Sequence, residues 1–193
     1  CEECLTKGYR TCIKKRCVKG SLFASVVRVF SMKVHKAMNV YKGVDAFITP
    51  SEFLKKKLIE NGFDENKITC IPTFTASKSE VGKPQVGTYG LYFGRVTEEK
   101  GVDTVVKAYE MMPDRHVKIM GDDTTDEAKR LKAYIKEKKT KNVEFLGFKA
   151  GEELEEIIKG ARFTLIPSIW YDNLPNTALE SFQYSKPVIA SNI

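Results

Sequence analysis

Residues 88–112, TYGLYFGRVTEEKGVDTVVKAYEMM, decide the fold of this chain. The segment begins with TYGLYFG, a short apolar run that is typical of a buried β-strand. A polar loop follows at 95–100, and apolar residues then recur at helical spacing up to residue 112. A buried strand joined to a helix by a short loop predicts one unit of a parallel α/β sheet.

The same alternation continues to the end of the chain. Upstream, residues 45–74 predict one more β-α-β piece, in which Ser51 caps the helix and Gly62 ends it. The predicted fold class is α/β, with a doubly wound, Rossmann-like C-terminal half and the last part of an N-terminal Rossmann-like domain. Further strands are predicted at HVKIMG (116–121), VEFLG (143–147), RFTLIPS (162–168) and PVIAS (187–191), with helices at 126–139, 151–161 and 175–184.

Three stretches of the chain differ in character. Residues 1–75 form the end of a first domain with a cysteine-rich start, and residues 88–193 form a second domain. Between them, residues 76–87 are small and polar with Pro and Gly, which is typical of a linker. The chain starts at Cys1 rather than Met and stops within a predicted strand, so we expect it to be an incomplete piece of a longer protein.

The composition is that of a folded protein, with 42% hydrophobic and 30% charged residues. The net charge is +7, and all of the excess lies in residues 1–75, which hold 14 Lys or Arg against 7 Asp or Glu. Such a segment could attract the phosphates of nucleic acid, lipid or nucleotide, or it could simply be a solvated basic surface.

Four cysteines crowd the start of the chain, at Cys1, Cys4, Cys12 and Cys17. Their spacing could bring four thiolates around a structural zinc ion. Two disulfides would suit a secreted protein equally well. Nothing else in the sequence indicates secretion, so free or metal-bound thiols are favoured over disulfides.

Residues 21–42 predict an amphipathic helix. The polar stripe could meet an anionic lipid surface, although a solvated surface helix is the commoner outcome of such a pattern. The apolar stripe, which is expected to face the core, consists of Phe23, Val27, Phe30, Val34, Met38 and Tyr41. The polar, partly basic stripe consists of Ser21, Ser25, Arg28, Met32, His35, Asn39 and Lys42.

Two loops at the carboxyl ends of predicted strands carry charged residues. The first loop runs from Gly94 to Gly101 and offers Arg95 and Lys100, a guanidinium and an ammonium group that suit a diphosphate. The loop is neither a Walker A loop nor a GxGxxG fingerprint. Ligands of doubly wound sheets bind at these strand ends, so a diphosphate site is expected there.

The second loop lies in WYDNLPNTALE, residues 170–180. Pro175 fits the first position of a helix, which would leave the amides of Asn176 and Thr177 free to bind a phosphate. Glu180 lies on the same helix face, and Asp172 approaches from the loop. Carboxylates repel phosphate but accept hydrogen bonds from hydroxyls, so two acids flanking a phosphate site indicate a sugar nucleotide.

These motifs resemble those of the retaining glycosyltransferases of the GT-B fold, specifically family 4, also called glycosyl transferases group 1. GRVTEEKG resembles the family's GR-x4-KG segment, and DNLPNTALESFQYSKPVIAS resembles its E-x7-E motif and following strand. VEFLGFKAGEELEEIIKGARFTLIPS is similar to its base-binding loop, helix and strand. The cysteine cluster and VDAFITPSEFLKKKLIENGF look like the end of the acceptor-binding domain.

The resemblance implies roles for individual residues. Arg95 and Lys100 would neutralise the diphosphate, Glu180 would bind the ribose hydroxyls, and Asp172 would take the place of the first Glu of E-x7-E at the donor hexose. These four form the implied catalytic set. The remaining implied donor-binding residues are Gly94, Gly147 and Phe148 beside the nucleobase or donor, and Asn173, Leu174, Asn176 and Thr177 at the helix start.

Two positions depart from the family pattern. Asp172 is one methylene shorter than the usual Glu, which could alter the choice of donor. Leu174-Pro175 stands where the family often has Phe-Gly, and Pro175 cannot donate a backbone hydrogen bond.

The resemblance implies an enzyme that moves a hexose from a nucleotide-diphosphate sugar to a glycan or lipid-linked acceptor, with retention and no required metal. We expect it in the cytoplasm or peripherally at an anionic membrane, without nucleic acid, and we expect the fragment alone to be inactive. Two alternatives stay open. One is a cysteine-rich, basic binding module for metal and nucleic acid or membrane, and the other is a scaffold that binds nucleotide sugar without turnover.

Overall fold

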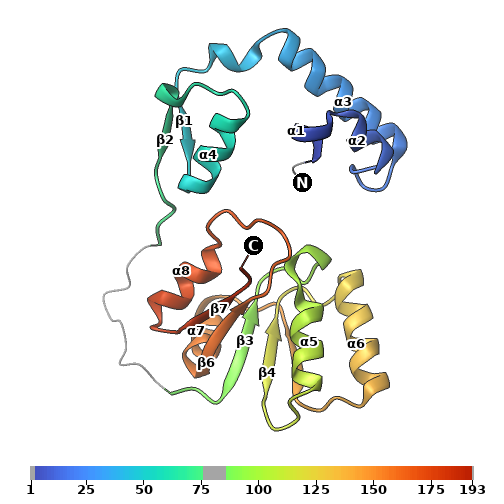
Figure 1. Ribbon diagram of the computed structural model, residues 1–193. Coiled ribbons are helices and arrows are strands. Elements are labelled where there is room, and N and C mark those ends of the chain that lie inside the picture. Colours follow the sequence, from blue (N-terminus) through green and yellow to red (C-terminus); the bar gives the residue numbers. More distant parts are fainter. Residues whose placement is uncertain (1–2, 76–85, 193) are drawn as a thin grey trace. The chain divides into compact units, whose positions relative to one another are not determined.

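The computed structural model describes residues 3–75 and 86–192, so most of the predicted linker lies outside the described residues. The chain divides into two compact units, Cys1–Pro72 and Thr73–Ile193. Each unit contains parallel strands and helices (Figure 1).

The second unit contains a five-stranded sheet in which every pair of neighbours is parallel. Along the sheet the order is β5-β4-β3-β6-β7. The chain moves outward from β3 to β5 and then returns to the other side of β3, so the strand order reverses between β3 and β6. This is the doubly wound arrangement that the sequence predicts. The strands are β3 (Tyr89–Phe93), β4 (Val117–Met120), β5 (Val143–Gly147), β6 (Ala161–Ile166) and β7 (Val188–Ala190).

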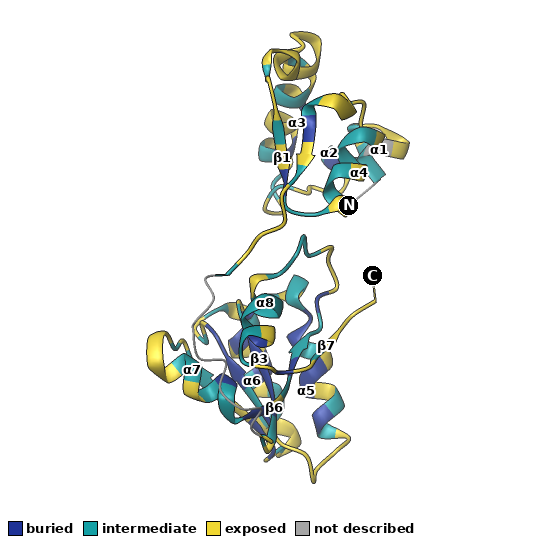
Figure 2. Ribbon diagram, turned by 90° about the vertical axis from the view of Figure 1, so that its left-hand side faces the viewer, coloured by how far each residue is buried: buried dark blue, intermediate teal, exposed yellow. Residues whose placement is uncertain are grey.

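Helices cover both faces of this sheet. A hydrophobic cluster on one face joins α5 (Val102–Glu110) and α6 (Asp126–Lys138) to β3 and β4. A second cluster on the opposite face includes side chains of α7 (Gly151–Gly160). The last helix, α8 (Asn176–Gln183), packs against β6 and β7. Buried residues follow the strands and the sheet-facing sides of the helices (Figure 2).

Strand β3 lies at the centre of the sheet and is buried on both faces. Leu91 and Phe93 belong to the cluster on the α7 face, whereas Tyr92 belongs to the cluster on the α5 face. Alternate residues of a strand point to opposite faces, so an apolar run without polar interruption is what such a central strand requires. The predicted strand at 88–94 is therefore confirmed.

The first unit contains the predicted β-α-β piece. Strands β1 (Phe47–Thr49) and β2 (Ile68–Cys70) pair in parallel and are connected through α4 (Glu52–Glu60) and a 3-10 turn, η2 (Glu65–Lys67). The Ser51 hydroxyl accepts a hydrogen bond from the Leu54 amide at 3.2 Å, which confirms the predicted N-cap.

The start of the first unit is helical. Two short helices, α1 (Glu3–Lys7) and α2 (Arg10–Lys14), precede α3 (Leu22–Ala37), and a 3-10 turn, η1 (Val40–Gly43), follows it. The helix predicted at 21–42 therefore ends five residues early, because Asn39 adopts the left-handed conformation at φ +50°.

The predicted burial of α3 is wrong. Phe23, in the stripe expected to face the core, is 79% exposed, and Phe30 and Met38 are exposed as well. The buried side chains of this helix are Ser25 and Val29, of which Ser25 was expected on the outward, polar stripe.

Ser25 shows why this side of the helix is buried. Its hydroxyl donates to the Ser21 carbonyl at 2.8 Å and accepts from the Val18 amide at 3.1 Å, so the chain that precedes the helix folds back onto this side. Helix α2 contacts α3. Periodicity identifies an apolar stripe, but it does not identify which side a neighbouring segment will cover.

The predicted zinc site is not tested by the structure, because Cys1 lies outside the described residues. Cys12 is buried and Cys17 is exposed. Burial raises the pKa of the Cys12 thiol, and the neighbouring Cys17 raises it further. Within residues 3–75 and 86–192, no three His, Cys, Asp or Glu side chains are grouped in a way that could hold a metal ion. No helix in these same ranges is long and apolar enough to cross a bilayer.

Candidate functional site

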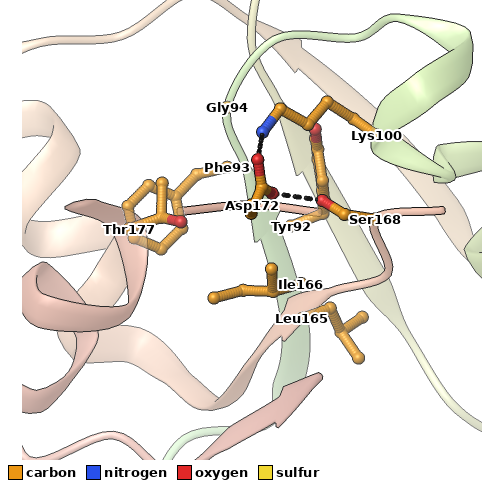
Figure 3. A pocket seen from close by; sticks show the side chains of 9 residues that line it. All are labelled: Tyr92, Phe93, Gly94, Lys100, Leu165, Ile166, Ser168, Asp172 and Thr177. Atoms are coloured by element: carbon orange, nitrogen blue, oxygen red, sulfur yellow. Dashed lines mark hydrogen bonds and ion pairs between the residues drawn. The ribbon is translucent and has the colours of Figure 1, made fainter. Parts of the chain in front are cut away.

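A pocket lies where the order of strands reverses. The loops at 94–101 and 167–175 leave the carboxyl ends of β3 and β6, which are neighbours in the sheet, and the pocket lies between them. Figure 3 shows the side chains that line it: Tyr92, Phe93, Gly94, Lys100, Leu165, Ile166, Ser168, Asp172 and Thr177.

A close backbone contact joins the two loops. Gly101 has φ +67° and follows the 3-10 turn η3 (Glu98–Lys100). A Cβ atom at this position would lie 2.0 Å from the Pro167 carbonyl oxygen. One hydrogen bond reinforces the contact, because the Ile169 amide donates to the Glu99 carbonyl at 3.0 Å. The two loops are therefore held as one unit, and glycine is required where they meet.

Lys100 and Asp172 form an ion pair across the loops. The Lys100 Nζ lies 2.6 Å from Asp172 Oδ1, and the two side chains are only 20% and 21% exposed. The Ser168 hydroxyl donates to the other carboxylate oxygen, Oδ2, at 2.5 Å (Figure 3). The sequence predicted both charged residues at the site but did not predict that they bind each other.

This arrangement keeps Asp172 ionised. Burial alone would raise the pKa of Asp172, but the hydrogen bonds from Lys100 and Ser168 outweigh burial and hold the pKa below its usual range. The result is a carboxylate of fixed orientation at the wall of the pocket, and such a group can accept hydrogen bonds from hydroxyls.

Glu180 lies in a different environment. It is partly buried on α8, one helical turn after the pocket residue Thr177, and it is not among the residues that line the pocket. Burial raises its pKa above the usual carboxyl range. The two predicted acids therefore belong to the same edge of the sheet but differ in the direction in which their pKa values shift.

Arg95 does not point into the pocket. Its side chain is 74% exposed, and its Nη2 atom lies 3.9 Å from Glu99 Oε1. The Tyr92 hydroxyl donates to the Arg95 carbonyl at 2.6 Å, so the backbone of Arg95 is fixed while its guanidinium group lies in solvent.

The start of α8 differs from the prediction by one residue. Pro175 occupies the N-cap position, not the first helical position, and the helix begins at Asn176. Leu174 has φ +59°, and its amide donates to the Asp172 carbonyl at 3.2 Å. Asn173 completes this turn. The first amides of an α-helix lack partners within the helix, and in α8 these first amides belong to Asn176 and Thr177.

The predicted nucleobase residues lie at the end of β5. Gly147 is the last residue of that strand with φ +71°, and Phe148 follows it with an exposed ring. Strands β4 and β3 separate β5 from β6 in the sheet. The structure thus places Gly147 and Phe148 at the same edge as the pocket but away from its lining.

Sequence reasoning missed several pocket residues, among them Ser168 and Tyr92. Ser168 is the last residue of the predicted strand RFTLIPS, and a hydroxyl at the carboxyl end of a buried parallel strand is a signal that could have identified it. Tyr92 lies inside an apolar strand, so its sequence context indicates only core packing.

The model of the family described as glycosyl transferases group 1 matches residues 74–193, which is more than half of the chain. The chain belongs to this family. An uncharacterized glycosyltransferase of Methanocaldococcus jannaschii is 30% identical over 105 residues, which cover 53% of this chain and 27% of the relative.

Solved glycosyltransferase structures share the fold of this chain. The lipopolysaccharide outer core galactosyltransferase WaaB is 21% identical with a TM-score of 0.61, over 76% of this chain and 43% of its own. Anabaena HepE in complex with UDP and glucose is 20% identical with a TM-score of 0.64, over 76% and 44%. A TarM variant of S. aureus, in complex with Fondaparinux, alpha-GlcNAc-glycerol and UDP, is 17% identical with a TM-score of 0.65, over 77% and 30%.

These similarities establish the architecture as part of the GT-B fold, as the sequence predicts. The chain spans about a quarter of the length of the curated relative and less than half the length of these solved structures.

Replacing Gly101 with Ala is expected to lower the free energy of unfolding by about 3 kcal/mol or more, because the new Cβ would meet the Pro167 carbonyl and the backbone would be strained. Gly151→Ala is the matched control, since Gly151 has a similar φ of +60° but open space around its Cβ position. This control variant should lower the free energy of unfolding by only about 1 kcal/mol. Equal losses in urea denaturation would show that the loop contact contributes nothing.

The Glu180→Gln variant is expected to be more stable than the parent at pH 7, because it removes a carboxylate whose ionisation is opposed by burial. The raised pKa means that the folded parent binds this proton more tightly than the unfolded chain. Parent stability therefore falls as pH rises from about 4.3 through the raised folded-state pKa.

Urea denaturation at several pH values checks this expectation. The stability gap between Glu180→Gln and parent should be absent below about pH 4 and open above the folded-state pKa. Glu137→Gln, at an exposed position of α6, is the matched control for removing a carboxylate from a helix. A less stable Glu180→Gln variant at pH 7 would contradict the assignment of burial as the dominant effect.

Proposed function

We propose that this chain supplies the nucleotide-sugar site of a retaining glycosyltransferase of family 4. The whole protein would transfer a hexose from a nucleotide-diphosphate sugar to a glycan or lipid-linked acceptor. The observation that carries the proposal is the Lys100–Asp172–Ser168 cluster beside the start of α8, at the point where the strand order reverses. This cluster combines a cation and an ordered carboxylate in one pocket, next to the first turn of a helix.

Each group has a role in the proposed reaction. Lys100 and the amides of Asn176 and Thr177 would hold the diphosphate, since an ammonium group has three donors and can keep Asp172 while binding a phosphate oxygen. Asp172 would accept hydrogen bonds from hexose hydroxyls. Glu180, once ionised, would accept hydrogen bonds from the ribose hydroxyls. Arg95, whose guanidinium group is exposed, would turn from Glu99 toward the diphosphate.

The bond that breaks joins the anomeric carbon of the hexose to a diphosphate oxygen. The electron pair leaves with the diphosphate, and a hydroxyl oxygen of the acceptor forms the new bond to the anomeric carbon while its proton is released. Negative charge grows on the leaving group, so Lys100, Arg95 and the helix amides would stabilise the transition state more than the ground state. In this proposal that charge is met by protein groups alone.

A donor-binding scaffold without turnover is the second candidate. It is favoured by one observation, the N-cap position of Pro175, which cannot donate a hydrogen bond to a hexose or phosphate. Measurements of binding and of turnover separate the two candidates, because the scaffold would bind nucleotide sugar as tightly as the enzyme. Nucleotide binding is measured without an acceptor, whereas turnover is measured with one.

Calorimetric titration with UDP, GDP and their hexose conjugates tests the proposal. One nucleotide is expected to bind, and Lys100→Ala or Glu180→Gln should each weaken it about 10- to 100-fold, as expected for the loss of a charge-assisted hydrogen bond. The matched control is Arg162→Ala, which removes an exposed cation near the amino end of β6 and should leave the affinity unchanged. Absence of binding by the folded parent chain would refute the proposed function.

We also propose that α3 contacts an anionic membrane. The contact would be made mainly by the exposed apolar face of the helix rather than by its polar stripe. Leu22, Phe23, Val26, Val27 and Phe30 are exposed on this helix, and Arg28 and Lys33 lie on it as exposed cations. An exposed apolar face flanked by cations is the pattern of a helix that lies in the membrane interface.

Flotation with phosphatidylglycerol vesicles tests this contact. The parent chain is expected to float at low salt, and a Phe23→Ser, Phe30→Ser double variant should remain in the dense fraction. The control is Phe182→Ser, which removes an exposed ring from α8 in the other unit. If the parent chain does not float at low salt, the membrane proposal is wrong.

A further inference from the structure

Three large side chains, Ile169, Trp170 and Tyr171, are exposed in the loop that follows β6. Because two of the three are aromatic, we call residues 169–171 the aromatic segment. Their exposed fractions are 63%, 57% and 45%. The residues on either side, Ser168 and Asp172, both line the pocket and are hydrogen-bonded to each other. The aromatic segment therefore extends outward from the wall of the pocket and is anchored there at both ends.

The backbone of this segment is held in place. The Ile169 amide donates to the Glu99 carbonyl, and Pro167 is in backbone contact with Gly101. Consecutive Cα atoms are about 3.8 Å apart, so the Cα atom of Trp170 lies within about 7.6 Å of that of Asp172. The exposed rings therefore start from backbone atoms that lie close to Asp172 in the chain.

Exposed aromatic rings of this kind are typical of binding surfaces. Trp and Tyr combine a large apolar ring with one polar atom, and they are enriched where one side of the contact is apolar and the other is wet. A pyranose has the matching chemistry, because its C–H bonds form an apolar face and its hydroxyls lie around the edge. A sugar stacked on Trp170 could therefore direct hydroxyls toward nearby polar groups, of which Asp172 is one.

The nucleobase of a donor is expected elsewhere, beside Gly147 and Phe148. The exposed ring of Phe148 lies at the end of β5, three strand spacings from β6, which is about 14 Å across the sheet. The donor hexose is tied to the diphosphate, which the proposed function places at Lys100 and α8. A second sugar that approaches this hexose would meet the aromatic segment, which adjoins the same carboxylate.

We propose that Trp170 and Tyr171 form a stacking platform for a pyranose ring of the acceptor. This proposal rests on the proposed function, because it is the donor site that makes the neighbouring sugar an acceptor. In this proposal, two residues outside the donor-binding set determine specificity for the acceptor. The part of the acceptor that contacts them is a carbohydrate.

Intrinsic fluorescence tests the platform directly, since Trp170 is the single tryptophan of the chain. The probes are the methyl glycosides of glucose, galactose, mannose and N-acetylglucosamine, each titrated with and without the nucleotide that binds best. At least one glycoside is expected to change the emission saturably, with half-saturation at millimolar concentration. Tyr171→Ser should raise that concentration about five-fold or more, whereas Phe182→Ser, at an exposed ring on α8, should not change it.

Several results would overturn the platform. No emission change with any glycoside at about 100 mM would do so. A change caused only by lipid vesicles would assign the segment to a membrane surface instead. A glycoside signal that a nucleotide sugar abolishes, but the free nucleotide does not, would assign the rings to the donor hexose. Nucleotide binding is measured in the same samples, so its loss marks failure of the proposed function, and its persistence without a sugar response marks failure of the platform alone.

Discussion

The close approach of Gly101 to the Pro167 carbonyl is the constraint on which the site depends. It holds the loop after β3 against the loop after β6, and these loops carry the cation and the carboxylate of the pocket. A doubly wound sheet only brings the two strand ends next to each other. The Lys100–Asp172 ion pair forms because the backbones meet without a side chain between them.

The two acids of the site are held in opposite electrostatic states. Lys100 and Ser168 keep the pKa of Asp172 low, whereas burial raises the pKa of Glu180. Asp172 is consequently an ordered acceptor whose charge is already compensated. Glu180 has an ionisation that burial opposes, and a donor hydroxyl could offset this cost by hydrogen bonding to the carboxylate. The proposed function assigns these two residues to the two sugars of a nucleotide sugar.

The fold could be predicted from the sequence because buried parallel strands are short apolar runs that alternate with helices, and β3 is an example. The sequence also predicted that Lys100 and Asp172 lie at the same edge of the sheet, because each residue follows the carboxyl end of a strand. It did not indicate that they pair, since they are far apart in the chain and their contact depends on the Gly101 turn. The buried face of α3 was also predicted wrongly, because Ser25 is covered by a segment whose own helices had not been predicted.

The anchoring of residues 169–171 between two pocket residues also restricts how this part of the chain can change. Ser168 and Asp172 hydrogen-bond to each other across these three residues, so a loop one residue longer or shorter would displace the carboxylate from Lys100. New side chains can be introduced here, but the length cannot vary without loss of the ion pair. The aromatic segment would therefore change during evolution by substitution, whereas insertions and deletions would be tolerated only elsewhere on the surface.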